Sequence, residues 1–300
     1  MNERMAFIGV TTGSSSIMKI FPAWADELEL PTRTLEGVDI ALDADDAAFR
    51  AAVERIKRDA AHRGALVTTH KMSLYTAAHD LFDELDEFAV ACGEISSISK
   101  RNGRLLGHAK DPITATAGLD ELFPAGGFGG EREAIILGAG GAGLALSWGL
   151  AEREDLPSRI VVTDTSRERL QHLLDVHAER GTPRSLLEVH DAHETAGILA
   201  SAPEGSLVVN ASGLGKDRPG SPVPDGTFFP RAATVWEFNY RGSLEFLQQA
   251  REQESSRDLR VFDGWRYFIH GWTQVIGEVF DVEMTGERVD RLAEIAEGCR

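Results

Sequence analysis

Short apolar runs of strand length alternate with amphipathic helical stretches along most of the chain. Strand candidates in the first third are residues 5–11, 33–42 and 65–69, and apolar residues recur at helical spacing behind Asp45, a candidate N-cap, between the last two. Further on, Asn102-Gly103 separates two strand-like segments and favours a tight hairpin. This alternation is typical of βαβ units and predicts the α/β class with a mostly parallel sheet.

A second alternation follows the densest cluster of glycine and proline, at residues 123–130. Because these residues break regular structure, we interpret the cluster as a linker or surface loop before a second domain. We therefore expect a first α/β domain over residues 1–116 and a second domain over 117–264. The helical pattern within residues 265–300 is expected to pack back on the first domain.

The second domain opens with a glycine-rich turn between a predicted strand and a predicted helix. Gly138, Gly140 and Gly143 stand in a G-x-G-x-x-G frame. The first glycine permits a tight turn, the second lets the backbone approach a pyrophosphate, and the third lets the helix pack on the strand. Together with Gly141 and Ala142, this turn presents free N–H groups to the phosphates. It predicts a Rossmann-type doubly wound dinucleotide-binding domain; a methyltransferase or flavin site and a turn without ligand are the alternatives.

An acidic residue ends the next predicted strand, about 20 residues past the last glycine, and this residue is Asp164. A carboxylate there accepts hydrogen bonds from the adenosine ribose hydroxyls and repels a 2′-phosphate, so the sequence favours NAD over NADP. Arg167 follows closely and could offset that repulsion. Asp164 could also be the N-cap of the following helix, and the two roles are compatible.

The net charge and the composition exclude some kinds of binding partner. The 300 residues carry 48 acidic and 31 basic side chains, a formal net charge of −17. This excess repels phosphate backbones and anionic lipid surfaces, so we expect no nucleic-acid partner and no membrane partner. Only Cys92 and Cys299 are present, which gives no disulfide framework, and no apolar run approaches the roughly 18 residues of a membrane span. We expect a cytoplasmic protein without a signal peptide. The sequence does not decide the oligomeric state, and a homodimer is one possibility.

One cluster of histidine and acidic residues, His190 to Glu194, contains side chains of the types that bind metals. Its spacing matches neither His-Glu-x-x-His nor a Cys/His site. We interpret it as a solvated helix start and expect no metal.

A lysine and an aspartate end two strand-like segments in the first domain. Lys71 ends Gly64-Ala-Leu-Val-Thr-Thr-His-Lys71, and Asp111 ends Leu105-Leu-Gly-His-Ala-Lys-Asp111. At these residues the sequence resembles the shikimate and quinate dehydrogenase family, whose patterns are Gly-x-Asn-Val-Thr-x-Pro-x-Lys and Gly-x-Leu-x-Gly-x-Asn-Thr-Asp. The resemblance runs nearly end to end and includes the glycine turn.

The resemblance implies that Lys71 and Asp111 are the catalytic pair. When a hydride passes between a carbinol carbon and a nicotinamide, the hydroxyl proton must be taken up or returned, and a lysine oriented by a carboxylate can do this. A surface lysine and a helix-capping aspartate are the alternatives. The other residues that the resemblance implies are, for the substrate, Ser14, Ser16, Thr68 and Gln274 and, for the nicotinamide ribose, Asn210, Ala211 and Gly215.

This sequence departs from the family patterns at positions that would contact the substrate. Ser96 replaces a substrate-binding asparagine, and Ala109-Lys110 precede Asp111 where the family has Asn-Thr. If the strand ends before Lys110, its ammonium reaches the cleft and binds an anionic substrate group; if the strand continues, Lys110 points to solvent. We therefore expect shikimate itself to be a poor substrate.

The sequence predicts an NAD(P)-dependent oxidoreductase of the shikimate dehydrogenase-like type. It would interconvert alcohol and ketone reversibly on a small hydroxylated, cyclic carboxylic acid related to shikimate or quinate, with NAD preferred. The alternative function is a non-catalytic dinucleotide-binding regulator whose substrate site has drifted.

Overall fold

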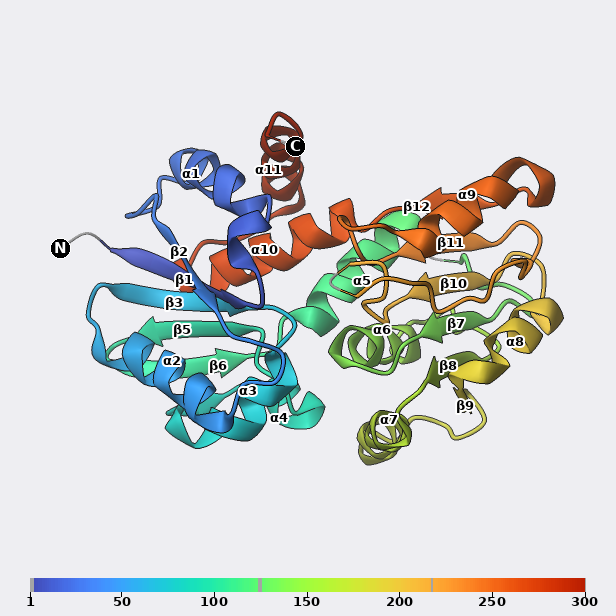
Figure 1. The fold of residues 1–300 in the computed structure, drawn as a ribbon, viewed down its shortest axis with the longest axis horizontal. Coiled ribbons are helices and arrows are strands. Elements are labelled where there is room, and N and C mark those ends of the chain that lie inside the picture. The colour runs from blue at the N-terminus through green and yellow to red at the C-terminus, as the bar shows by residue number, and fades with distance from the viewer. Residues whose placement is uncertain (1–2, 124–125, 217, 300) are drawn as a thin grey trace. The chain divides into compact units, whose positions relative to one another are not determined.

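The computed structural model describes residues 3–123, 126–216 and 218–299, which form two compact units (Figure 1). Unit 1 comprises Met1–Asp111 and Ile269–Arg300, and unit 2 comprises Pro112–Phe268. Two helices continue from one unit into the other: α5 (Asp111–Leu122) and α10 (Trp265–Phe280).

Unit 1 contains one six-stranded sheet in the order β2-β1-β3-β5-β6-β4. Among its described residues, the other elements are five α-helices and two short 3-10 helices, together with the part of α10 that belongs to this unit. The bounds are β1 (Arg4–Gly9), η1 (Thr12–Ser14), α1 (Ile17–Glu27), β2 (Leu35–Asp39), α2 (Asp46–Arg58), β3 (His62–Val67), α3 (Lys71–Ala78), η2 (His79–Leu81), β4 (Glu84–Leu85), α4 (Glu87–Cys92), β5 (Ser97–Arg101), β6 (Arg104–His108) and α11 (Gly286–Glu297).

The sheet of unit 1 is mostly parallel, as expected, with one strand, β5, running the opposite way. β1 runs parallel to β2 and β3, whereas β5 runs antiparallel to both β3 and β6. The predicted hairpin at Asn102-Gly103 is confirmed, with both residues at positive φ (52° and 76°), as a two-residue turn of this kind requires. The hairpin sets the antiparallel pairing of β5 with β6, and β5 is the one reversed strand of this sheet.

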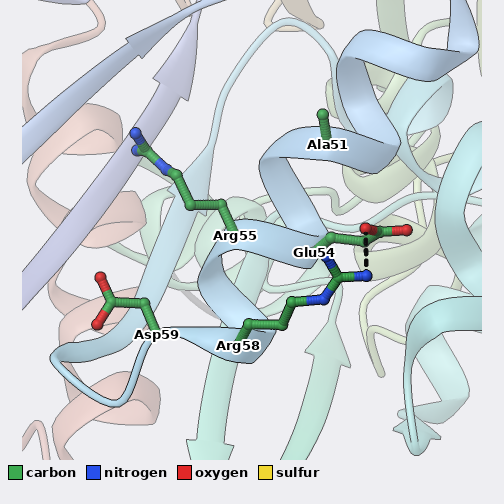
Figure 2. A pocket seen from close by; sticks show the side chains of 5 residues that line it. All are labelled: Ala51, Glu54, Arg55, Arg58 and Asp59. Carbon is green, nitrogen blue, oxygen red and sulfur yellow. Dashed lines mark ion pairs between the residues drawn. The ribbon is translucent and has the colours of Figure 1, made fainter.

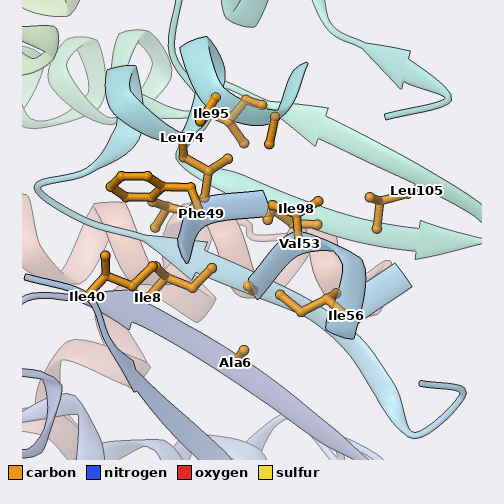
Figure 3. Close-up of a cluster of buried hydrophobic side chains, with 14 residues drawn as sticks. Ala6, Ile8, Ile40, Phe49, Val53, Ile56, Leu74, Ile95, Ile98 and Leu105 are labelled. Atoms are coloured by element: carbon orange, nitrogen blue, oxygen red, sulfur yellow. The ribbon is translucent and has the colours of Figure 1, made fainter. Parts of the chain in front are cut away.

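Helix α2 packs on this sheet through one apolar face (Figure 3). Phe49, Val53 and Ile56 recur at helical spacing and are buried against strand residues such as Ile8. Burying each of these side chains stabilises the fold by about 1.5–3 kcal/mol. Asp45 accepts the Ala48 N–H at 3.1 Å, so the predicted N-cap is confirmed.

Unit 2 contains a six-stranded sheet that is parallel throughout, in the order β12-β11-β10-β7-β8-β9. Counted from β7, this is the strand order 6-5-4-1-2-3 of the doubly wound dinucleotide-binding fold, so the Rossmann-type prediction is confirmed. The bounds are β7 (Ala134–Leu137), α6 (Gly141–Ala151), β8 (Ile160–Asp164), α7 (Arg167–Glu179), β9 (Leu187–Asp191), η3 (Ala192–Glu194), α8 (Thr195–Ser201), β10 (Leu207–Asn210), β11 (Thr234–Glu237), α9 (Glu245–Arg257) and β12 (Arg260–Phe262).

Two loops of unit 2 test sequence expectations. Residues 124 and 125 of the glycine-rich cluster lie outside the described residues, but Phe128 is buried and stacks on Phe123 at 4.2 Å. The described part of the cluster is therefore a packed loop within unit 2, not a linker. The segment around His190 is a helix start, as predicted, with a capping box formed by Asp191 and Glu194. Over the described ranges, we find no helix long and apolar enough to span a bilayer.

Candidate functional site

Lys71 and Asp111 form an ion pair in unit 1, in which the Lys71 ammonium donates a hydrogen bond to Asp111 Oδ2. β3 and β6 both run antiparallel to β5, so they point the same way and their carboxyl ends share one edge of the sheet. Lys71 follows β3 and Asp111 follows β6. This edge is where α/β proteins hold ligands.

Lys71 is the first residue of a helix rather than the last of a strand, which corrects the sequence interpretation. β3 ends at Val67, and the chain turns through Thr69, whose φ is +43°. His70 is buried, and its Nε2 lies 2.8 Å from the Ile40 carbonyl oxygen. Because a carbonyl oxygen only accepts, Nε2 is the donor here, and the bond anchors the turn that presents Lys71.

The electrostatics keep Lys71 charged. Burial alone would lower the pKa of Lys71, but the negative charge of Asp111, that of Glu94 once it is ionised, and the hydrogen bond to Asp111 outweigh it and raise this pKa. The ammonium is therefore a proton donor at neutral pH. It becomes a base when it loses that proton, and Asp111 holds it in place in both forms.

Glu94 is a member of this group that the sequence analysis missed. It is fully buried, and neither carboxyl oxygen has a hydrogen-bond partner. Burial and then the charge of Asp111 raise the pKa of Glu94 to about 8, against the opposing effect of Lys71. In the sequence it is simply a polar residue after a glycine, and no spacing rule marks it.

Three other predicted substrate residues of unit 1 follow neighbouring strands at the same sheet edge, and a fourth lies on a helix. β1 is parallel to β3, and it leads to Ser14, which is exposed, and to Ser16, which is partly buried. Thr68 follows β3 directly and donates its N–H to the Ile8 carbonyl at 3.0 Å. Gln274 is partly buried on α10. Their contact with a substrate stays a prediction.

Ser96 and Lys110 both have partners within unit 1. β6 ends at His108, so the strand stops before Lys110. The Lys110 ammonium nevertheless donates to Glu278 Oε2 on α10 at 2.7 Å, and the Lys110 N–H donates to Ser96 Oγ at 2.7 Å. The charge of Lys110 is thus already compensated, and its role in holding a substrate anion stays a prediction.

The glycine turn of unit 2 has the geometry that a dinucleotide requires. Gly138 has a φ of +118°, and a Cβ there would lie 2.7 Å from the backbone of Ser212. A Cβ on Gly143 would lie 1.9 Å from the Gly138 carbonyl oxygen. Gly140, in contrast, has open space on its Cβ side, just before the free N–H groups of Gly141 and Ala142 at the start of α6. The turn therefore fits a pyrophosphate.

Asp164 ends β8 beside this turn. Its Oδ2 accepts the Ala139 N–H at 2.7 Å, and its Oδ1 accepts the Ser166 N–H at 2.8 Å. Ser166 is the N-cap of α7, so that alternative role for Asp164 is wrong. A carboxylate has further lone pairs for ribose hydroxyls. The cation that the structure records beside Asp164 is Arg169, at 4.0 Å, whereas the sequence suggested Arg167.

The third predicted part of the cofactor site follows β10, which lies next to β7 where the strand order reverses. Asn210 donates to Glu237 Oε2 at 2.7 Å and accepts from Ser212 Oγ at 2.6 Å. Ala211 donates its N–H to the Leu137 carbonyl at 2.9 Å, and Gly215 has a φ of +86°. Burial chiefly raises the pKa of Glu237 to about 7.

A pocket at the C-terminal end of α2 does not belong to this site (Figure 2). It includes none of the predicted residues, and its two guanidinium groups already have partners. Arg58 pairs with Glu54 at 2.7 Å and Arg55 with Glu36 at 2.7 Å. It therefore gives no support for a ligand.

Comparisons with known proteins agree with this picture, although no family model matches the chain. A shikimate dehydrogenase (NADP(+)) of Streptococcus gordonii is 30% identical over 221 residues, which are 72% of this chain and 72% of that protein. A shikimate dehydrogenase (NADP(+)) of Brucella canis is 28% identical over 212 residues, 69% of this chain and 66% of that protein.

Solved structures share the fold over the full length. A quinate dehydrogenase from Corynebacterium glutamicum in complex with NAD has a TM-score of 0.74 at 22% identity, covering 99% of both chains. A shikimate 5-dehydrogenase from Thermus thermophilus in complex with NADP(H) and shikimate has a TM-score of 0.71 at 22% identity, covering 99% of this chain and 100% of that one.

The fold and these relatives define the class of this protein as an NAD(P)-dependent dehydrogenase. The chain belongs to the shikimate dehydrogenase family, as the resemblance predicted, and is an oxidoreductase of the shikimate and quinate dehydrogenase type.

Proposed function

We propose that the protein interconverts an alcohol and a ketone on a small hydroxylated, cyclic carboxylic acid related to shikimate or quinate, with NAD as the preferred cofactor. The observation that carries this proposal is the ion pair of Lys71 and Asp111 at the carboxyl edge of the unit 1 sheet. The names of the relatives and structural neighbours support the substrate class.

Lys71 moves the proton of the reacting hydroxyl. In ketone reduction, the protonated Lys71 gives its proton to the oxygen as that oxygen gains electrons; in alcohol oxidation, the neutral Lys71 takes the hydroxyl proton. Asp111 orients the amine and stabilises its charged form. The nicotinamide cofactor, when bound, supplies or accepts the hydride.

Each unit has its own binding task in this proposal. In unit 1, Ser14 and Ser16 hold the substrate carboxylate, and the remaining contacts come from Thr68 and Gln274. In unit 2, the turn from Gly138 to Gly143 holds the pyrophosphate. The nicotinamide ribose is held by Asn210, Ala211 and Gly215.

The preference for NAD rests on Asp164. Its carboxylate is fixed by two backbone N–H groups, so it cannot swing away from a 2′-phosphate without losing both bonds. The two bacterial relatives are named for NADP, while one neighbour holds NAD. Arg169 is the cation that would lessen the preference if it turned towards the phosphate.

The substrate is expected to differ from shikimate. The short Ser96 hydroxyl accepts the Lys110 N–H and donates to the His108 carbonyl oxygen at 3.5 Å, so a substrate hydroxyl that the family's asparagine would bind loses a partner here. A hydroxy acid whose polar groups avoid this position is expected to be used better.

The test is a screen of cyclic and acyclic hydroxy acids with NAD and with NADP, followed by the absorbance of the reduced nicotinamide. We expect turnover of at least one cyclic hydroxy acid, faster with NAD, and poor turnover of shikimate. Retained NAD binding without turnover of any hydroxy acid would contradict the proposal and favour a non-catalytic regulator. Binding of S-adenosylmethionine in place of NAD would favour a methyltransferase.

A further inference from the structure

Glu94 has no structural explanation in unit 1. It is 0% exposed, and both of its carboxyl oxygens are buried without a hydrogen-bond partner. A buried carboxylate without hydrogen bonds is strongly disfavoured, whereas an apolar side chain would fill the same space without that cost. Its presence therefore calls for a role other than packing.

The backbone around Glu94 is fixed by α4, which precedes it, and by Lys71 at the start of α3. The Glu94 N–H donates to the Ala89 carbonyl at 3.2 Å, and the next N–H, that of Ile95, donates to the Lys71 carbonyl at 3.2 Å. Gly93 at φ +63° ends α4 and directs the chain there. Glu94 is thus held next to the first turn of α3, where Lys71 lies.

Three titratable groups act on the Glu94 carboxyl. Lys71 at the start of α3 favours its ionised form, while Asp111 at the start of α5 and Asp86 at the N-cap of α4 favour its protonated form. Burial favours the protonated form most of all. Glu94 in turn acts on Lys71, since its negative charge raises the pKa of the ammonium.

We propose that Glu94 is a positioning residue of the acid–base site, a second carboxyl group that acts on the substrate's proton transfer through the charge of Lys71. The inference rests on the proposed function of Lys71 and Asp111. Glu94 need not touch the substrate.

The role follows from the order in which the groups lose their protons. At neutral pH Glu94 keeps its proton, so Lys71 and Asp111 form one balanced ion pair. At higher pH Glu94 releases its proton to solvent first, which leaves two carboxylates beside one ammonium. Lys71 then keeps its proton to a higher pH than Asp111 alone would allow.

The experiment is the pH profile of kcat/KM for alcohol oxidation, compared between the wild type and Glu94→Gln. Glutamine has nearly the same shape as the protonated acid but cannot ionise. The rising limb, which reports neutral Lys71, is expected to move to lower pH in Glu94→Gln, and the falling limb for ketone reduction should move the same way. Glu87→Gln removes the same charge from an exposed position of α4 and should leave both limbs in place.

Limbs that coincide in the wild type and in Glu94→Gln would overturn the inference. If Lys71→Ala leaves turnover intact, the proposed function fails; if Lys71→Ala loses turnover while the limbs stay fixed in Glu94→Gln, only this inference fails. A lower turnover without a moved limb would indicate a packing role and also overturn it.

A spectroscopic measurement covers the case in which Glu94→Gln folds poorly. Infrared spectra of the free wild-type protein on either side of pH 8 should show a buried carboxylic acid that loses its proton. Glu237, with a pKa raised by burial to about 7, contributes a second such band, which Glu237→Gln removes. Absence of any band that titrates near pH 8 in Glu237→Gln would overturn the inference.

Discussion

The carboxyl edges of the two sheets differ in the hydrogen bonding of their acidic side chains. In unit 2 the edge is built from backbone, and its buried carboxylates have partners: Asp164 accepts two N–H groups, and Glu237 accepts from Asn210. In unit 1 the edge carries the ion pair of Lys71 and Asp111 beside Glu94, whose carboxyl oxygens have no hydrogen-bond partner. Carboxylates whose hydrogen bonds are satisfied suit the binding of a ligand, whereas a carboxyl group without hydrogen bonds can gain or lose a proton and suits proton transfer.

The strongest test of the glycine turn at the carboxyl edge of the unit 2 sheet is Gly143→Ala. The new Cβ would lie 1.9 Å from the Gly138 carbonyl oxygen, so the strand and helix must separate. We expect a stability loss of about 1–3 kcal/mol and an NAD affinity at least about 100-fold weaker. Chemical denaturation and calorimetry would measure the two effects.

A matched glycine in unit 2 serves as the control. Gly197 lies in α8, and a Cβ there meets nothing within 4 Å. Gly197→Ala should leave NAD affinity unchanged. Equal affinities in Gly143→Ala and the wild type would show that the turn does not hold the cofactor.

Asp111→Asn tests the charged edge of unit 1. Loss of the carboxylate removes the largest of the influences that raise the pKa of Lys71 and leaves the opposing effect of burial, so this pKa should fall relative to the wild type. We expect turnover to fall by about 10², the lower end for lost acid–base help, and ketone reduction to fail at a lower pH than in the wild type. A pH profile of reduction that does not move would contradict this assignment.

Asp164→Asn tests cofactor choice at the backbone edge. The amide oxygen can still accept the Ala139 N–H, but the charge that repels a 2′-phosphate is gone. The ratio of kcat/KM for NADP to that for NAD should rise by about 10 to 100-fold. Asp175→Asn, on the exposed side of α7, should leave the ratio unchanged. An unchanged ratio in Asp164→Asn would mean that Arg169 or another group selects the cofactor.

The pH dependence of stability tests whether Glu94 is buried with its proton. Its pKa is raised to about 8 in the folded protein, so its contribution is fully present below the unfolded value of 4.5 and is lost as the pH rises towards 8. Relative to the wild type, Glu94→Gln should therefore gain at least about 1.4 kcal/mol in the free energy of unfolding between acid and mildly alkaline pH. Urea titrations of both proteins at acid and at mildly alkaline pH would measure this difference. If the free energies of unfolding of the wild type and of Glu94→Gln change in parallel with pH, the prediction is contradicted.

The same contrast explains what the sequence could predict. The glycine turn is local, since its residues are close in the sequence: Gly138 has a positive φ, Gly140 has open space on its Cβ side, and Gly143 leaves no room for a Cβ. The contact between Lys71 and Asp111 is not local, because it depends on two strands that a third, antiparallel strand separates. It was predicted only through a family resemblance.

What the sequence missed has physical reasons as well. Nothing in Cys92-Gly-Glu94 distinguishes a buried, unpartnered acid from a loop residue, because burial is a tertiary property. Arg169 lies beside Asp164, where the sequence predicted Arg167. The Ser166 N-cap sets where α7 begins and therefore which arginine side chain points back towards Asp164. Strand alternation cannot predict the environment of Lys110, because its partner, Glu278, lies on a helix and is 168 residues away in the sequence.

The most direct measurement of the central claim, that unit 1 moves the proton and unit 2 holds the dinucleotide, is a pair of values on one variant, Lys71→Ala. The NAD dissociation constant by calorimetry should stay within about twofold of the wild type, because Lys71 belongs to unit 1. Turnover of the best hydroxy acid should fall by about 10² to 10⁴. Lys19→Ala, at an exposed position of α1, should match the wild type in both values. Unchanged turnover in Lys71→Ala, or a loss of NAD affinity as large as the loss of turnover, would contradict the account.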